Sequence, residues 1–166
     1  MSDTNIYQFS VPKLDGEELN LSVFSGKVLL IVNTASQCGF APQLKELVAL
    51  KEEFSGQDFE ILAFPSNDFG GQEPLEGVEL AAFCENVATN YLTFDKVRVR
   101  GPYAHPLYKF LADKKLNGTV NSTPRWNFHK FLIDRSGAVK DFFFPFTKPT
   151  SSKIKKQISR LIAAGK

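Results

Sequence analysis

Apolar and polar positions follow two different periods along the chain, and each period predicts its own kind of element. The run from Val28 to Val32 is continuously apolar and rich in β-branched residues, which is typical of a strand covered on both faces. Apolar residues then recur at helical spacing between Pro42 and Phe54, and a second apolar run extends from Phe59 to Phe64. A strand, a helix and a second strand in this order predict a parallel strand pair joined by a crossover helix.

The second half of the chain continues this alternation. Apolar residues spaced by three and four predict amphipathic helices at 80–87, from Pro106 onward, and at 154–162. Before the last helix, the segments 126–134 and 138–144 flank the turn 135–137, which predicts a β-hairpin. This succession predicts an α/β thioredoxin-like fold, in which a mixed central sheet is flanked by helices.

Length, charge and cysteine usage narrow the class of protein. With 166 residues and 43% hydrophobic content, the chain is expected to form a single thioredoxin-like domain over 1–166. Its net charge of +2 gives no basic surface for nucleic acid, and no apolar run is long enough for stable membrane insertion. The first residues are polar, without a secretion-type apolar region, and two cysteines are too few for a disulfide scaffold. A cytoplasmic protein with chemically active thiols is expected.

Cys38 is the candidate nucleophile, because it lies in NTASQCGFAPQ between the first apolar strand and the helix that Pro42 begins. Free amide donors and the positive end of the helix dipole favour a thiolate at such a place, and the thiolate is the form that attacks electrophiles. No second cysteine follows Cys38 at CxxC spacing, which disfavours a disulfide reductase.

Two further segments carry hydrogen-bond donors that could meet Cys38. Gln72 follows the second apolar strand in FPSNDFGGQEP, and Trp126 and Asn127 stand at the start of the hairpin strand. Their amide and indole N–H groups could stabilise charge on a sulfur and on a departing oxygen, as reduction of a hydroperoxide requires. Taken singly, Trp126 could fill the core, and Gln72 or Asn127 could cap a turn.

The other polar residues give no metal or cofactor site. His105 and His129 have no cysteine or carboxylate at metal-binding spacing, so neither a metal nor an organic cofactor is expected. Three arginines could attract an anionic reductant or serve as solvated surface residues: Arg98, Arg100 and Arg125.

Four blocks of sequence, taken together, carry a resemblance over nearly the whole chain. NTASQCGFAPQ, FPSNDFGGQEP, AHPLYKFL and WNFHKFLID resemble, in order and spacing, the signature blocks of the glutathione peroxidase family. The resemblance implies a thiol peroxidase that reduces hydrogen peroxide and organic or lipid hydroperoxides. It also implies an active-site tetrad made of the peroxidatic Cys38 with Gln72, Trp126 and Asn127.

The chain also departs from the family pattern. Ala41 replaces a common threonine, Ser66 stands where many members have cysteine, and Asp68 stands where many have glutamine. A carboxylate close to Cys38 would oppose thiolate formation. The segment before Trp126 lacks the insertion of tetrameric members, so the resemblance is to the short, mostly monomeric branch.

Cys84 decides the expected electron donor. Its placement ahead of Phe94 is similar to that of the resolving cysteine in members that use thioredoxin, so a disulfide between Cys38 and Cys84 is expected, with local unwinding of the helix that carries Cys84. Without the resemblance, Cys84 would be read as a small core residue. Two alternatives remain: a one-cysteine peroxidase reduced directly by glutathione, and a thiol redox sensor that relays oxidation to a partner protein.

Overall fold

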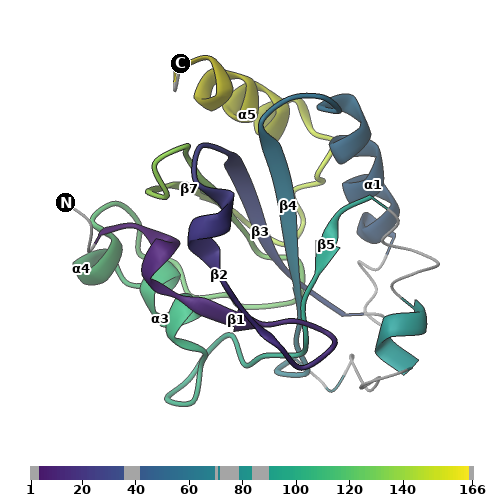
Figure 1. Cartoon of the computed structure of the whole chain (residues 1–166), viewed down its shortest axis with the longest axis vertical. Helices are drawn as coiled ribbons and strands as arrows, with labels where there is room; N and C mark the ends of the chain where they lie inside the picture. Colours follow the sequence, from purple (N-terminus) through teal and green to yellow (C-terminus); the bar gives the residue numbers. More distant parts are fainter. Residues whose placement is uncertain (1–3, 36–41, 70, 72–78, 84–89, 165–166) are drawn as a thin grey trace.

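A five-stranded mixed sheet forms the centre of the computed structural model, which describes residues 4–35, 42–69, 71, 79–83 and 90–164 (Figure 1). The strand order is β5-β4-β3-β6-β7. The strands are β3 (Val28–Thr34), β4 (Phe59–Pro65), β5 (Leu92–Thr93), β6 (Lys130–Ile133) and β7 (Val139–Phe143). β3, β4 and β5 are parallel, whereas β6 is antiparallel to both β3 and β7. The predicted mixed sheet is therefore confirmed.

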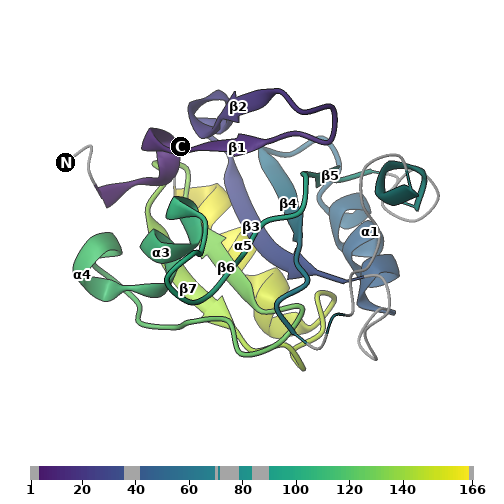
Figure 2. The same ribbon diagram turned by 90° about the horizontal axis from the view of Figure 1, so that it is seen from below.

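Helices and the N-terminal segment cover the two faces of this sheet (Figures 1 and 2). α1 (Gln43–Glu53) and α5 (Ser152–Ala164) pack on one face, where they share a core with Val28, Leu30 and Val32 of β3. The opposite face is covered by α3 (Pro106–Ala112) and by η2 (Ile6–Gln8), β1 (Ser10–Pro12) and η3 (Leu21–Phe24). β2 (Glu18–Asn20) pairs with β1, and α4 (Lys114–Asn117) follows α3.

The buried strand β3 explains why the core has two halves. Side chains alternate between the faces of a strand, so Leu29 and Ile31 enter the core half under α3, whereas Leu30 enters the half under α1 and α5. All seven residues of β3 are buried, as its continuous apolar pattern predicts. This double burial fixes the register of β3 and hence the position of its carboxyl end.

Several boundaries differ from the sequence-based expectation. Pro42 is the N-cap residue of α1 rather than its first helical residue, and its side chain forms no capping hydrogen bond. Trp126 lies in a bend before the hairpin, because β6 begins only at Lys130. The short strands β1, β2 and β5 were not predicted. Of the expected helix at 80–87, residues 79–83 are helical, and the rest lies outside the described residues.

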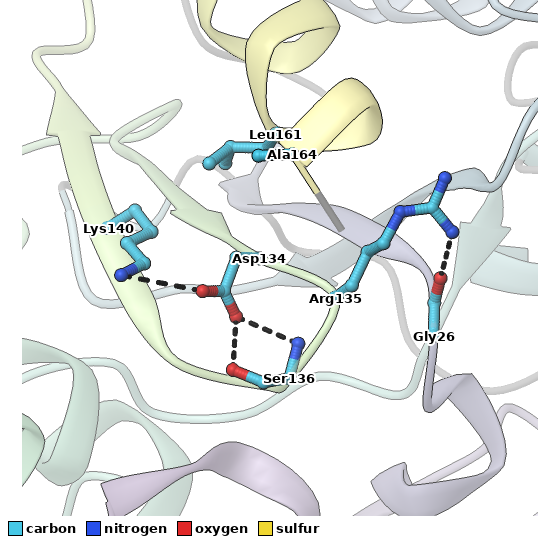
Figure 3. A pocket seen from close by; sticks show the side chains of 7 residues that line it. All are labelled: Gly26, Asp134, Arg135, Ser136, Lys140, Leu161 and Ala164. Atoms are coloured by element: carbon cyan, nitrogen blue, oxygen red, sulfur yellow. Dashed lines mark hydrogen bonds and ion pairs between the residues drawn. The ribbon is translucent and has the colours of Figure 1, made fainter. Parts of the chain in front are cut away.

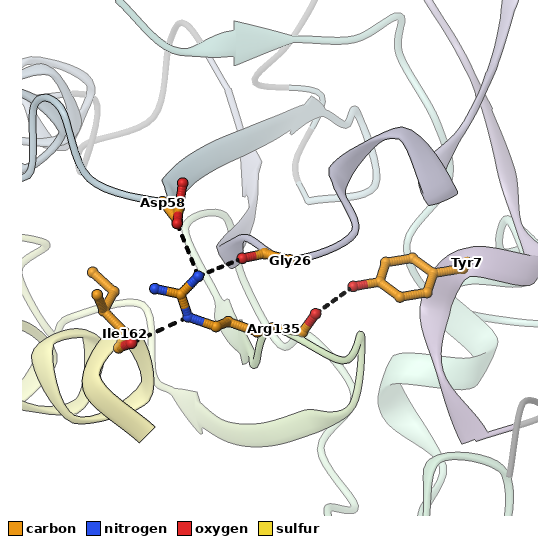
Figure 4. Close-up of polar contacts among 5 residues, drawn as sticks. All are labelled: Tyr7, Gly26, Asp58, Arg135 and Ile162. Carbon is orange, nitrogen blue, oxygen red and sulfur yellow. Dashed lines mark hydrogen bonds and ion pairs between the residues drawn. The ribbon is translucent and has the colours of Figure 1, made fainter. Parts of the chain in front are cut away.

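Arg135, in the turn between β6 and β7, fastens three elements at the amino-terminal end of β3 (Figures 3 and 4). Its guanidinium donates hydrogen bonds to the carbonyl oxygens of Gly26 at 2.8 Å and Ile162 at 3.1 Å, and to the carboxylate of Asp58 at 2.9 Å. A cavity of about 510 Å³ beside it is lined by Gly26, Asp134, Arg135, Ser136, Lys140, Leu161 and Ala164.

None of the helices in the described ranges is long and apolar enough to cross a membrane.

Candidate functional site

The expected site is described in part. Cys38, Gln72 and Cys84, as well as the substituted position Ala41, lie outside the described residues. Trp126 and Asn127 are described, and so are the residues that lead into the segments carrying Cys38 and Gln72.

Asn33, near the carboxyl end of β3, joins this strand to the turn that carries Trp126. Its side-chain amide donates to the carbonyl oxygen of Trp126 at 3.1 Å, and its own carbonyl oxygen accepts from the backbone N–H of Phe128 at 2.6 Å. Asn33 is completely buried, and its side-chain N–H group finds a partner there, as most buried donors do. The strand that leads to Cys38 is thus fastened directly to the Trp126–Phe128 turn.

Phe69 brings the loop after β4 to the same place. Its buried ring lies 5.6 Å, centroid to centroid, from the ring of Trp126. The guanidinium of Arg100 lies over the Phe69 ring, 5.8 Å from its centroid. Flanking residues of three loops, after β3, after β4 and before β6, therefore meet at one edge of the sheet. This is where parallel strands of an α/β sheet present their carboxyl ends.

The turn itself has an unusual backbone. Phe128 has a φ of 70°, and it is the one described residue other than glycine with a positive φ. This left-handed conformation is unfavourable for a side chain such as phenylalanine and persists only where the surroundings enforce it. Asn127 is fully buried and Trp126 is half-buried, so the turn places one donor in the interior and one near the surface.

Two buried bases follow the turn. His129 forms a 2.9 Å hydrogen bond with the hydroxyl of Ser122, and burial, assisted by the charges of Lys130 and Arg125, lowers its pKa to about 4. His129 is therefore neutral at physiological pH. Lys130 donates to the carbonyl oxygens of Phe128 at 2.6 Å and Pro145 at 3.3 Å, and burial lowers its pKa to about 7.

The carboxylate of Asp68 is held by the 98–99 segment. It accepts a hydrogen bond from the backbone N–H of Val99 at 2.7 Å, and the Nε of Arg98 lies 3.4 Å from it. Ser66 is buried, and its hydroxyl accepts from the backbone N–H of Asp68 at 3.2 Å. These partners satisfy the charge of Asp68 within its own part of the loop, which reduces the repulsion that this carboxylate could exert on a thiolate.

Sequence reasoning missed Asn33 and Lys130. Each has the same signal, which is a polar side chain inside an apolar strand pattern: Asn33 follows Leu29 to Val32, and Lys130 precedes Phe131 to Ile133.

The three arginines considered as anion-binding groups are exposed: Arg98, Arg100 and Arg125. In the described part of the chain, no cluster of three or more histidine, cysteine, aspartate or glutamate side chains could hold a metal ion.

Comparison with known proteins identifies the family. The family model described as glutathione peroxidase matches residues 6–112. A glutathione peroxidase of Lactococcus lactis subsp. cremoris is 43% identical over 159 residues, which cover 95% of this chain and 99% of that protein. A hydroperoxy fatty acid reductase of a Synechocystis species is 46% identical over 156 residues, covering 89% of this chain and 91% of the relative.

Solved structures agree with this assignment. The crystal structure of GPX1 from T. cruzi superimposes with a TM-score of 0.74 at 31% identity and covers 96% of this chain and 97% of its own. A thioredoxin-family thiol:disulfide interchange protein from Chlorobium tepidum, at 16% identity and a TM-score of 0.62, covers 93% of this chain and 92% of its own, and shows the fold alone. The predicted thioredoxin-like fold is confirmed. The chain belongs to the glutathione peroxidase family and is a peroxide-reducing oxidoreductase.

Proposed function

We propose that Cys38 is the peroxidatic thiol and that Gln72, Trp126 and Asn127 are its hydrogen-bond donors. The thiolate sulfur attacks one oxygen of a hydroperoxide, the O–O bond breaks, and Cys38 becomes a sulfenic acid. The departing oxygen takes up a proton and leaves as water or an alcohol. The observation that carries this proposal is the pair of hydrogen bonds between Asn33 and the Trp126–Phe128 turn, because they join the strand leading to Cys38 to two of the proposed donors.

The second half of the proposed cycle uses Cys84. Its thiol condenses with the Cys38 sulfenic acid, which forms a disulfide and releases water. A dithiol protein of the thioredoxin type then reduces this disulfide and returns both cysteines to thiols. Thioredoxin-like reduction is favoured over glutathione by the placement of Cys84 in the sequence. Residues 79–83, just ahead of Cys84 in the sequence, are helical, and local unwinding of this helix during closure of the disulfide belongs to the same proposal.

The test follows the sulfur atoms through one turnover. Reduced protein is mixed with one equivalent of hydrogen peroxide in a stopped-flow instrument, and the product is mapped by mass spectrometry. We expect a Cys38–Cys84 disulfide in the wild type, a persistent sulfenic acid in Cys84→Ser, and no oxidation in Cys38→Ser. A stable Cys38 sulfenic acid or glutathione adduct in the wild type would contradict the two-cysteine cycle and favour direct reduction by glutathione. Fast oxidation with slow steady-state turnover would instead favour a redox sensor.

We also propose that fatty acyl hydroperoxides are substrates. Phe144 and Phe146, which follow β7, expose 44% and 69% of their surface, and their rings stack at 5.8 Å. Phe144 also lines a cavity of about 380 Å³ together with Arg125, the neighbour of Trp126. Stacked rings at the water boundary offer apolar surface to an acyl chain, and Arg125 offers charge to its carboxylate.

A double substitution tests this substrate class. Phe144→Ser with Phe146→Ser should lower kcat/KM for a fatty acid hydroperoxide by about tenfold, because roughly 1.4 kcal/mol of apolar contact corresponds to that factor. The value for hydrogen peroxide should stay unchanged. Val23→Ser, which alters an equally exposed apolar residue on η3, is the control. Equal loss for both peroxides would contradict the proposal.

We also propose that the enzyme is a monomeric, single-domain protein of the cytoplasm. Sedimentation of the purified chain tests its oligomeric state.

A further inference from the structure

Lys130 has a completely buried side-chain amine that joins three separate segments. From β6, its Nζ reaches back to the carbonyl oxygen of Phe128 at 2.6 Å and across to the carbonyl oxygen of Pro145 at 3.3 Å. The same Pro145 oxygen accepts a 2.7 Å hydrogen bond from the side-chain amide of Gln43, the first residue of α1. A continuous polar chain therefore runs from the Phe128 turn, through Lys130 and Pro145, to the start of α1.

Packing alone does not account for a lysine at this position. Its side chain points into the apolar half of the core that contains Phe128 and Leu132, and none of the ion pairs in the described part of the chain includes it. Burial without a carboxylate partner disfavours the charged amine, and accordingly the pKa of Lys130 is lowered to about 7 by burial, against the opposing effect of Glu46 on α1. A methionine of similar length would fill the same volume without this desolvation cost.

The conformation of Phe128 gives the lysine a specific task. Both peptide groups of this residue are held: its N–H by the carbonyl oxygen of Asn33 at 2.6 Å and its carbonyl oxygen by Lys130. With a φ of 70°, Phe128 would tend to relax toward an ordinary negative value if one of these bonds were lost. Such a rotation would reorient the peptide plane that leads back to Asn127 and Trp126.

We propose that Lys130 is a positioning residue for peroxide reduction: by holding the carbonyl oxygen of Phe128, it fixes the direction in which the Trp126 and Asn127 donors point. Through Pro145 and Gln43, it also fastens these donors to the beginning of α1, the helix that follows Cys38 in the sequence. This inference rests on the proposed function, in which Trp126 and Asn127 stabilise the reacting sulfur and oxygen. Lys130 itself exchanges no proton with the substrate.

Replacement by methionine tests the proposal. In a Cys84→Ser background, which isolates the first step, Lys130→Met should lower the second-order rate constant for oxidation by hydrogen peroxide by about tenfold or more, because displaced catalytic groups lose rate steeply. Trp126 is the one tryptophan of the chain, so its fluorescence reports the turn directly. We expect a shifted emission maximum in the folded variant. Lys51→Met is the matched control, since Lys51 also donates to a backbone carbonyl, that of Phe59 at 3.0 Å, and its rate and spectrum should equal those of the parent.

Two further measurements keep the proposal falsifiable. The rate of Cys38 alkylation by iodoacetamide against pH reports the thiolate, and its midpoint should be the same with Lys130 and with methionine. A shifted midpoint with unchanged tryptophan emission would overturn positioning in favour of a direct effect of the charge on the thiol. Gln43→Met, which removes the other donor to Pro145 and keeps Lys130, should slow oxidation by a smaller factor, and it carries the test if Lys130→Met does not fold.

The outcomes separate this inference from the function on which it rests. A parent protein that does not react with hydrogen peroxide, or a Cys38→Ser variant that reacts equally well, would refute the proposed function. A parent that reacts while Lys130→Met reacts at the same rate would refute the inference alone.

Discussion

At the scale of single residues, Gly137 shows how tightly the N-terminal segment is fitted to the sheet. It has a φ of +84°, and a Cβ atom there would lie 2.8 Å from two atoms of the Tyr7 ring. The hydroxyl of Tyr7 donates to the carbonyl oxygen of Arg135 at 2.9 Å, so the ring cannot simply swing away. We expect Gly137→Ala to lower the free energy of unfolding by about 2–4 kcal/mol, which combines backbone strain with overpacking. Urea denaturation measures this loss.

Gly16 provides the control for that prediction. Its φ of +91° is similar, but nothing lies within 4 Å of the position that a Cβ would occupy. Gly16→Ala should therefore cost only the backbone strain, about 1 kcal/mol. Equal losses for the two variants would mean that Tyr7 moves aside freely and that packing against Gly137 contributes nothing.

At the scale of elements, Arg135 joins the loop before β3, the residue before β4 and the end of α5 (Figure 4). Its side chain is 14% exposed, and of its three hydrogen bonds the one to Ile162 is partly buried, whereas those to Gly26 and Asp58 lie at the surface. Arg135→Met should lower the free energy of unfolding by about 1–3 kcal/mol, since it leaves the partly buried carbonyl group of Ile162 and the carbonyl group of Gly26 without their charged donor. Arg160→Met, at an exposed position of α5, should change it by less than about 0.5 kcal/mol. Amide hydrogen exchange that stays slow in α5 of Arg135→Met would contradict this role.

The elements that the sequence predicts well are those whose own pattern decides their structure. β3 and β4 are continuously apolar, and α5 repeats its isoleucines every fourth residue, so local patterning is sufficient there. β5 has only two residues, and it exists because β4 offers an unpaired edge. A pairing of this kind depends on tertiary position, which no local pattern encodes.

The same distinction applies to the site. Trp126 and Asn127 could be proposed as donors from their side-chain chemistry. The prediction that they stand at the start of the hairpin strand was wrong, because the left-handed Phe128 ends a turn before β6 begins at Lys130. The side chain of Asn33 donates to a backbone carbonyl 93 residues away in the sequence, and that of Lys130 to one 15 residues away. Such contacts follow from the strand order, so the sequence alone could mark these residues only as polar exceptions in apolar strands.

At the scale of the whole molecule, His129 links stability to pH. Its pKa is lowered to about 4 by burial in the core beneath Phe142 and Phe131, whereas a histidine in the unfolded chain titrates near about 6.5. Between these two values the unfolded chain binds a proton that the native protein does not bind. The free energy of unfolding therefore falls as the pH falls through this window, and the contribution of the neutral, buried His129 is fully present above about pH 7. From pH 7.5 to 5, the expected contribution of His129 to the loss is about 2 kcal/mol.

His129→Phe isolates this contribution, because phenylalanine keeps an aromatic ring against Phe142 and does not titrate. Urea denaturation at pH 7.5 and at pH 5 gives, for each protein, the decrease in the free energy of unfolding between these two pH values. This decrease should be smaller in the variant than in the wild type by about 2 kcal/mol. The unfilled hydrogen bond of Ser122 affects both pH values equally, so it cancels in this difference. His105→Asn is the control. This half-buried histidine caps α3 by accepting a hydrogen bond from the backbone N–H of Leu107, and asparagine preserves the cap. Most of the decrease in the free energy of unfolding between pH 7.5 and pH 5 should therefore remain in this variant. If the wild type and His129→Phe lose the same stability, His129 is protonated in the native protein as readily as in the unfolded chain, and its burial does not control the acid limit of the fold.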